Sequence, residues 1–275
     1  MVVQHNLQAA NTNRQLGITT SAQAKSTEKL SSGYKINRAA DDAAGLSISE
    51  KMRSQIRGLN KASSNAQDGV SLVQTAEGAL NETHSILQRM NELATQAANG
   101  TNTSVDRSAI SAELDQLTSE INRIQSTTQF NTMNLLDGTF SGATNQMKLQ
   151  VGALSGQSID FSIANMCATK IGLKETLSVS TFTKAGSYMK SVQDAIEVVS
   201  KQRSAMGAIQ NRLEHTIANL DTTSENTQSA ESRIRDTDMA SEMVTYSKNN
   251  ILAQAGQSML AQANQSTQGV LSLLQ

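Results

Sequence analysis

Residues 56–98 read IRGLNKASSNAQDGVSLVQTAEGALNETHSILQRMNELATQAA, and this stretch decides the fold. Apolar residues recur in it at alternating steps of three and four, and a second such row runs beside the first. A repeat of about 3.5 residues predicts one long helix that buries two adjacent faces, extending for about 65 Å. The rows are Ile56, Leu59, Ser63, Ala66, Val70, Val73, Glu77, Leu80, His84, Leu87, Asn91, Ala94, Ala98, and Ala79, Thr83, Ile86, Met90, Leu93, Ala97.

Two further helices are predicted by the same step. Asn99-Gly100 ends the first helix, because Gly tolerates a left-handed cap, and Thr103 or Ser104 can cap the next helix ahead of Asp106. Three long helices with matching seams predict a bundle. The second and third seams consist of Ile110, Leu114, Leu117, Ile121, Ile124 and of Val192, Ile196, Val199, Arg203, Met206, Gln210, Leu213, Ile217, Leu220.

Between the second and third helices the period changes to two. This alternation predicts a β-hairpin with its turn at residues 154–157, and another short strand beyond it. The hairpin positions are Met147, Leu149, Val151, Ile159, Phe161 and Ile163, and the further strand comprises Leu177, Val179 and Thr181.

The two chain ends carry weaker helical patterns. Both are rich in Asn, Gln and Thr, so they favour helices that are marginal alone and that order on packing. Gly256 and Gly269 each cost about 1 kcal/mol relative to Ala in the C-terminal helix. Its ladder runs through Met239, Met243, Tyr246, Asn250, Ala253, Gln257, Leu260, Asn264, Thr267, Leu271 and Leu274, and the N-terminal pattern through Val3, Leu7 and Ala10.

The expected fold is therefore mostly α. It comprises a long antiparallel helical bundle or coiled coil with a small β-hairpin, plus a terminal two-helix coiled-coil domain made from both ends of the chain. We expect residues 1–40 with 236–275 to form the terminal domain, residues 41–140 with 186–235 to form the bundle, and residues 141–185 to form the part of the bundle domain that contains the hairpin.

Composition excludes several classes of function. Only 37% of the 275 residues are hydrophobic and 3% aromatic, so one thick globular core is not expected. A net charge of −1 gives no reason to expect a nucleic-acid partner, and no apolar run is long enough for membrane insertion. The N-terminus lacks an apolar signal segment, which taken alone favours a cytoplasmic protein. Cys167 is the single cysteine, so no internal disulfide is expected.

No catalytic constellation or cofactor motif is found. His5, His84 and His215 are far apart and lack metal-ligand spacing. The acidic doublet Asp41-Asp42 could be an acid/base pair, but a charged helix start explains it better. We expect no enzyme activity, no cofactor and no metal.

Four blocks of the sequence resemble the bacterial flagellins: MVVQHNL (residues 1–7), LSSGYKINRAADDAAGLSISEKMRSQIRGL (30–59), SAESRIRDTDMASEM (229–243) and QGVLSLLQ (268–275). The resemblance covers about residues 1–140 and 186–275. It implies a structural subunit of the flagellar filament, with the paired termini lining the filament core. Since only about 45 residues separate the second and third helices, the resemblance indicates a short form without outer variable domains.

The resemblance also implies partners and a location. The chain would polymerise with itself through Val3, Leu7, Met243, Leu260, Leu271 and Leu274. It would be secreted through the flagellar type III apparatus after a chaperone has masked its C-terminal helix, and would meet the filament cap and the hook-junction proteins outside the cell.

Residues 88–102 resemble the flagellin patch recognised by host Toll-like receptor 5. The family's contact positions fall on Arg89, Leu93 and Glu113, with Gln88 and Gln96 beside them. If the helices fold back near residue 103, Leu93 and Glu113 lie at equal heights about 15 Å from the turn. The alternative is that Leu93 belongs to the bundle core and that the charges are merely solvated.

Two other classes of function remain open at this point. A hook–filament junction protein shares the terminal helices, and a discrete coiled-coil adaptor would have the same helical pattern. A protease inserted in the middle segment is disfavoured, because residues 141–186 contain no His to bind zinc.

Overall fold

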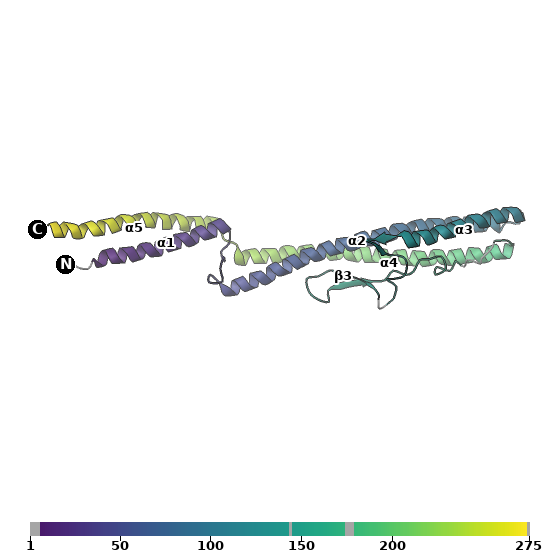
Figure 1. Cartoon of the computed structure of the whole chain (residues 1–275), viewed down its shortest axis with the longest axis horizontal. Helices are drawn as coiled ribbons and strands as arrows, with labels where there is room; N and C mark the ends of the chain where they lie inside the picture. Colours follow the sequence, from purple (N-terminus) through teal and green to yellow (C-terminus); the bar gives the residue numbers. More distant parts are fainter. Residues whose placement is uncertain (1–5, 143–144, 174–178, 274–275) are drawn as a thin grey trace. The chain divides into compact units, whose positions relative to one another are not determined.

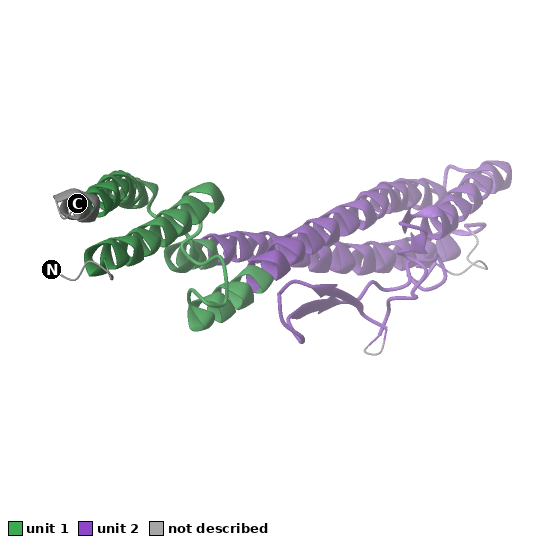
Figure 2. Cartoon of the chain, turned by 60° about the vertical axis from the view of Figure 1, so that its left-hand side comes forward, with its two compact units in different colours: residues 1–54, 226–275 green, residues 55–225 purple. Residues whose placement is uncertain are grey.

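The computed structural model describes residues 6–142, 145–173 and 179–273. The chain forms two compact units (Figure 2): unit 1 contains residues 1–54 and 226–275, and unit 2 contains residues 55–225. The mostly helical fold with small strand pairs is confirmed (Figure 1). Its elements are α1 (Leu7–Ser32), α2 (Ala43–Ala97), α3 (Ser104–Thr127), β1 (Gln129–Phe130), β2 (Met133–Asn134), β3 (Met147–Gln150), β4 (Ser158–Phe161), α4 (Phe182–Arg235) and α5 (Met239–Leu273).

Unit 2 is a bundle in which α2 runs antiparallel to α4. Ser63 donates a hydrogen bond to Asp221 at 3.0 Å, and further along α2 the Glu77 carboxylate lies 3.6 Å from Arg203. The predicted seams are buried: Leu80, Leu87 and Val199 are fully enclosed, as are Ile121 of α3 and Leu213 of α4. Hydrophobic burial along these narrow seams therefore holds the three long helices together.

The start of α3 matches the predicted cap. Thr103 accepts a hydrogen bond from the Asp106 amide, and the Asp106 carboxylate accepts from the Thr103 amide at 2.8 Å. This reciprocal pair satisfies backbone donors that a helix start leaves free. The backbone hydrogen bond from Thr103 lowers the pKa of the Asp106 carboxyl group.

The predicted β-hairpin is confirmed as β3 and β4, which pair antiparallel with Leu149 opposite Ile159. It lies against α2 where that helix carries glycines. A Cβ atom at Gly58 would come within 2.7 Å of the Ala153 Cβ, and one at Gly69 would collide with Leu149. These glycines let the hairpin approach the helix backbone closely.

The expected third strand is wrong within the described residues: Val179 and Thr181 belong to no strand, and Leu177 lies outside the described residues. Thr181 instead precedes α4, where its carbonyl oxygen accepts a hydrogen bond from the Ala185 amide at 2.9 Å. The period-two pattern is too short there to compete with the start of a long helix.

A second hairpin, which the sequence did not predict, joins β1 to β2. Its two turn residues, Asn131 and Thr132, both have positive φ angles, of 48° and 64°. Positive φ at both positions is typical of a type I′ turn, for which Asn-Gly is the usual sequence. A β-branched residue in the left-handed region is strained, so Thr132 is an unfavourable residue for this turn.

Replacing Thr132 with Gly is therefore expected to raise the free energy of unfolding by about 0.5–1 kcal/mol. Glycine avoids the cost of about 1–2 kcal/mol that other residues have in the left-handed conformation, but part of this gain is lost because glycine makes the unfolded chain more flexible. Chemical denaturation followed by circular dichroism measures the change. Thr101→Gly is the matched control, since Thr101 also lies in a turn and has no positive φ. Equal effects of the two substitutions would contradict the strain argument.

Unit 1 is an antiparallel pair of α1 and α5. Asn6 donates to the Ala263 carbonyl at 3.0 Å, and Lys29 lies 3.7 Å from Glu242. Midway between these contacts, a Cβ atom at Gly256 would lie 3.2 Å from Leu16 Cδ1. Gly256 weakens α5 as an isolated helix, but here it provides the space that Leu16 needs.

The seam of α5 uses only part of the predicted ladder. Tyr246, Ala253 and Leu260 face inward as expected, whereas Met243 and Gln257 are exposed. Glycine contributes no apolar signal, so a pattern based on side chains selected the neighbouring Gln257 instead of Gly256. The positions of α5 that are buried or half-buried are Glu242, Tyr246, Asn249, Asn250, Ala253, Gly256, Leu260 and Ala263, and those of α1 include Ala9, Thr12, Leu16, Thr19, Gln23, Ser26 and Leu30.

Candidate interaction surfaces

The α1–α5 pair leaves much of its apolar surface uncovered. Among the described residues of unit 1, the buried hydrophobic side chains are Ile36, Ala253 and Ala263. In contrast, Val244, Ile251, Leu252 and Met259 are 46–71% exposed and recur at steps of seven and eight residues. A step of seven returns to nearly the same side of a helix and a step of eight lands about 80° further round, so these four residues form one apolar stripe of α5 that is about 100° wide.

The outer face of α1 carries a similar feature. Leu7 is 75% exposed and Ile18 is 59% exposed, and the eleven positions that separate them make about three helical turns. Both therefore lie on the same side of α1. These two exposed apolar side chains make the outer face of α1 a candidate for contact with another protein.

The expected polymerisation residues occupy different environments. Leu7 and Met243 are exposed, whereas Leu260 is half-buried in the α1–α5 seam. The backbone of Leu271 lies in α5, but its side chain is not described. Val3 and Leu274 lie outside the described residues. The apolar stripe of α5 was missed because Val244, Ile251 and Met259 fall outside the expected ladder.

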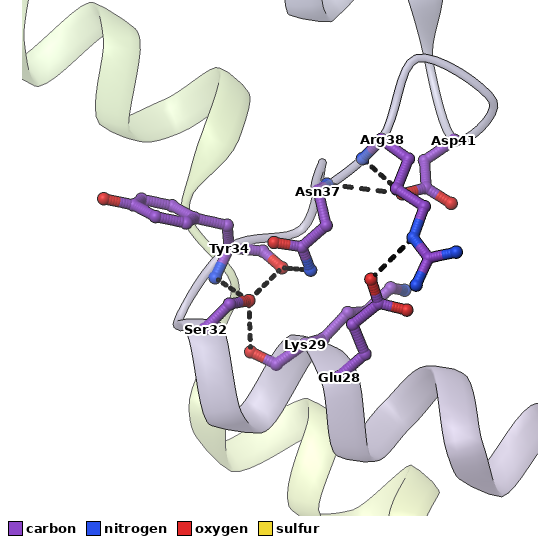
Figure 3. Close-up of polar contacts among 7 residues, drawn as sticks. All are labelled: Glu28, Lys29, Ser32, Tyr34, Asn37, Arg38 and Asp41. Atoms are coloured by element: carbon purple, nitrogen blue, oxygen red, sulfur yellow. Dashed lines mark hydrogen bonds and ion pairs between the residues drawn. The ribbon is translucent and has the colours of Figure 1, made fainter.

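Within unit 1, the connection between α1 and α2 is held by polar contacts (Figure 3). Ser32 accepts a hydrogen bond from the Tyr34 amide at 3.1 Å, Asn37 donates to the Tyr34 carbonyl at 3.2 Å, and Arg38 donates to Glu28 at 2.9 Å. Backbone pairing of Tyr34 with Asp236 ties this connection to the one between α4 and α5. The two connections therefore stabilise each other.

The acidic doublet has a structural role in this connection. Asp42 accepts a hydrogen bond from the Gly45 amide at 2.9 Å and so caps α2. Asp41 accepts from the Arg38 and Asn37 amides, and these backbone hydrogen bonds lower the pKa of its carboxyl group. A lowered pKa keeps the group ionised near neutral pH, which does not suit a general acid.

The predicted receptor patch is only partly at the surface. Arg89 and Glu113 are exposed and form an ion pair between α2 and α3, with Arg89 Nη2 3.0 Å from Glu113 Oε1. This pairing is the main cause of a raised pKa of the Arg89 guanidinium. Gln88 and Gln96 are exposed as well. Arg89, Glu113, Gln88 and Gln96 are together called the polar patch below.

Leu93 does not belong to that exposed patch. Its side chain is 2% exposed and packs in the main hydrophobic core of unit 2. The Leu93 side chain therefore offers little surface in this arrangement, and a direct receptor contact at Leu93 stays a prediction. The second apolar row of α2 turns toward the bundle, so the alternative assignment of Leu93 to the core is the one that the structure supports.

Within residues 6–142, 145–173 and 179–273, no group of three or more His, Cys, Asp and Glu side chains could hold a metal ion. None of the helices in the described part of the chain is long and apolar enough to cross a membrane.

Comparison with known proteins gives a consistent answer. The bacterial flagellin N-terminal helical region matches residues 3–141, and the bacterial flagellin C-terminal helical region matches residues 189–274. The chain is 54% identical over 275 residues to a flagellin of Halalkalibacterium halodurans and 51% identical over 303 residues to a flagellin of Bacillus subtilis. Each comparison covers 100% of both chains.

Solved structures show the same fold. The crystal structure of Bacillus cereus flagellin is 30% identical with a TM-score of 0.51, over 57% of this chain and 88% of that chain. A putative flagellar hook-associated protein from Vibrio parahaemolyticus gives a TM-score of 0.60 at 15% identity, over 71% of this chain and 100% of that chain. At that identity the second likeness shows the fold alone, so the fold does not separate filament subunits from hook-associated proteins.

A helical chain that pairs its own ends and exposes apolar residues along the pair has the design of a self-associating structural protein. The family matches make this specific: the chain belongs to the bacterial flagellin family. It is a short-form structural subunit that polymerises into the flagellar filament, and it is not an enzyme. The discrete adaptor is thereby set aside, and identity to flagellins over the whole chain favours a filament subunit over a junction protein.

Proposed function

We propose that subunits of this flagellin join through the apolar stripe of α5 and the exposed face of α1, with Leu7 and Met243 at the edges of the contact. The observation that carries the proposal is the exposure of Val244 and Ile251, at 71% and 67%, in a unit that buries few hydrophobic side chains. A contact between two different faces does not close on itself and so generates an open helical fibre. Leu260 contributes indirectly by holding α5 against α1.

Assembly would then also stabilise α1 and α5. The pair has a polar seam and a small apolar contact, and isolated helices of this kind are marginal in water. Burial of their outer faces between subunits offsets the conformational entropy lost on ordering. Helix formation at the chain ends is thus coupled to polymerisation.

Limited proteolysis tests this coupling. We expect cleavage within α1 and α5 in the monomer and protection of both helices in filaments, because only the filament covers their outer faces. Cleavage within residues 55–225 serves as the control and should be slow in both forms, since that bundle has its own core. Equal resistance of α1 and α5 in monomer and filament would contradict coupled ordering.

The same exposed face would need protection before assembly. A dedicated export chaperone that covers α5 removes Ile251, Leu252 and Met259 from water and so prevents premature association. Export through the flagellar type III apparatus would then place the chain outside the cell, where it meets the filament cap and the hook-junction proteins. Membership of the flagellin family and the exposed face of α5 support this proposal of partners and of a secreted location.

A host receptor would engage the polar patch of α2 and α3. Arg89 and Glu113 present adjacent opposite charges at 3.0 Å, and Gln88 and Gln96 supply further hydrogen-bonding groups. An exposed ion pair contributes little to stability, so its groups are available for intermolecular contacts. Toll-like receptor 5 would bind this patch on monomers, with Leu93 supporting the helix from the core.

Substitution of the patch is expected to weaken binding of the receptor ectodomain to monomeric flagellin. Arg89→Ala and Glu113→Ala should each reduce affinity by about tenfold or more, as loss of a contact Arg commonly does. Arg123→Ala is a matched control, because Arg123 is an exposed α3 residue paired with Glu120. Surface plasmon resonance gives the affinities, and unchanged binding of both patch variants would rule the site out.

Leu93→Ala should behave differently from the patch variants. Truncation of a buried Leu costs about 2–5 kcal/mol of stability, so any loss of receptor binding should accompany loss of bundle stability. Thermal unfolding of the same sample distinguishes this indirect effect from loss of a contact.

A further inference from the structure

The turn between α2 and α3 contains the single Asn-Gly dipeptide of the sequence, Asn99-Gly100. Glycine has no side chain to shield its amide nitrogen, and a Cβ atom added at Gly100 would meet nothing within 4 Å. Both residues are exposed and lie after the last residue of α2, Ala97. Water and the neighbouring peptide therefore have free access to the Asn99 side chain.

The Asn99 side chain folds over the peptide that follows it. Its Oδ1 accepts a hydrogen bond from the Thr101 amide at 3.4 Å, which brings the side-chain carbonyl toward the intervening Gly100 nitrogen. The amides of Asn99 and Asn102 donate to backbone carbonyls, but in the described part of the chain we find no hydrogen bond from the Gly100 amide. The Gly100 nitrogen is thus uncommitted and close to an electrophilic carbon.

We propose that Asn99-Gly100 is a site of spontaneous deamidation with isoaspartate as the favoured product. After loss of its proton to water or hydroxide, the Gly100 nitrogen attacks Asn99 Cγ and forms a new N–C bond. The Cγ–Nδ2 bond then breaks, and the departing nitrogen takes up protons and leaves as ammonia. Water opens the resulting five-membered imide at one of its two carbonyls, giving aspartate or isoaspartate. The sum consumes one water and releases one ammonia.

Arg107 favours the isoaspartate product. Its Nη2 donates to the Asn99 main-chain carbonyl at 3.2 Å, and its Nη1 donates to the Ser180 carbonyl at 3.4 Å. In isoaspartate the main chain runs through Cγ, and the former main-chain carbonyl becomes a free carboxylate. A hydrogen bond that is now neutral on the acceptor side would thereby become a stronger, charge-assisted one.

A second feature of Arg107 supports this assignment. Its Nε is buried and has no hydrogen-bond partner among the described residues. Buried donors without partners are rare in folded proteins, and a carboxylate with two oxygens can accept from Nε and Nη2 together. The product therefore satisfies a donor that the unmodified turn leaves unpaired.

The modification would change the turn in two ways. It adds one negative charge, and isoaspartate lengthens the main chain by one methylene between α2 and α3. These helices carry Arg89 and Glu113, so the modification lies at the end of the segment that holds the polar patch. The proposal does not depend on how subunits assemble or on what binds the patch.

The test uses the purified full-length chain incubated at neutral and mildly alkaline pH. Peptide mapping by mass spectrometry detects conversion of the amide to an acid, and labelling by an isoaspartyl methyltransferase identifies the isomer. We expect time-dependent conversion at Asn99 that is faster at higher pH, because attack requires the deprotonated Gly100 amide. Asn102, which precedes Thr103 in the same turn, is the internal control and should remain unmodified.

Three variants make the result decisive, with circular dichroism confirming that each one folds. Gly100→Ala should lose most of the conversion, Asn99→Asp provides the reference for mass and charge, and Arg107→Gln should lower the share of isoaspartate. An unmodified Asn99, or equal rates in Gly100→Ala and the native chain, overturns the site. An unchanged isomer ratio in Arg107→Gln overturns the role of Arg107.

Discussion

An Ile251→Asp chain is expected to remain monomeric at concentrations at which the native chain forms filaments. Burying an isoleucine side chain contributes about 2–3 kcal/mol, and burying a carboxylate without a partner costs several kcal/mol more. Since each 1.4 kcal/mol changes an equilibrium by about tenfold, the critical concentration should rise by about a hundredfold or more. Sedimentation after addition of native filament seeds measures it.

Two controls distinguish the loss of an apolar side chain from the stripe and the effect of an added negative charge on α5. Ile251→Leu keeps an apolar side chain and should polymerise normally. Gln257→Asp adds the same charge within two helical turns, but Gln257 is an exposed polar residue about 120° from Ile251 around the helix, on the side away from Leu252 and beyond Met243. Assembly of Ile251→Asp at the native critical concentration would show that the stripe is not an interface.

Leu260→Asp should also prevent polymerisation, but for a different reason. Leu260 lies in the α1–α5 seam, so a charge there disrupts the pair before any subunit contact forms. Helical content of the monomer should therefore fall in Leu260→Asp and stay native in Ile251→Asp. The sequence alone did not separate these two roles, because a heptad pattern identifies which residues share a face but not which partner covers that face.

Gly58→Ala is expected to destabilise unit 2 by about 1–3 kcal/mol, the usual cost of overpacking, even though alanine is the better helix former by about 1 kcal/mol. The added Cβ would lie 2.7 Å from the Ala153 Cβ and 3.2 Å from its Cα. These atoms are fixed to the backbone and cannot swing away, so the loop between β3 and β4 must move. Chemical denaturation provides the measurement.

Gly78→Ala is the matched control in the same helix. A Cβ at Gly78 meets nothing within 4 Å, so only the helix propensity changes, and stability should rise by up to about 1 kcal/mol. The two substitutions are thus expected to have opposite signs. If Gly58→Ala also stabilised the chain, the hairpin would not rest on α2 as described.

The long helices were predictable because their burial follows a simple period. The row from Ile56 to Ala94 lies within α2, and its last member, Ala98, directly follows the end of that helix. Thr103 caps α3, as its hydroxyl and the following Asp106 indicated. The β3–β4 hairpin was predictable from its alternation. Each of these signals is carried by side chains within one continuous segment.

Two kinds of feature were not predictable: contacts between segments far apart in the sequence, and roles of glycine, which has no side chain to contribute to a pattern. From the sequence, Gly256 only lowers the stability of α5. The structure shows that Leu16, 240 residues away, packs against it. The β1–β2 turn lacks the usual Asn-Gly sequence, so it gave no signal. Leu93 could be assigned to the core only when α3 and α4 were seen to cover the second row of α2.

The pairing of α1 with α5 also sets an order of events during synthesis. α1 is made first, but its partner is made last: Asn6 bonds to Ala263, 257 positions later. At about 5–20 residues per second, α1 waits roughly 10–50 s for α5 to follow it from the ribosome. Throughout that interval Leu16 has no Gly256 to pack against. A chain that stops before α5 can complete its bundle but never its terminal pair, so translation to the last helix is a requirement for a subunit with both ends in place.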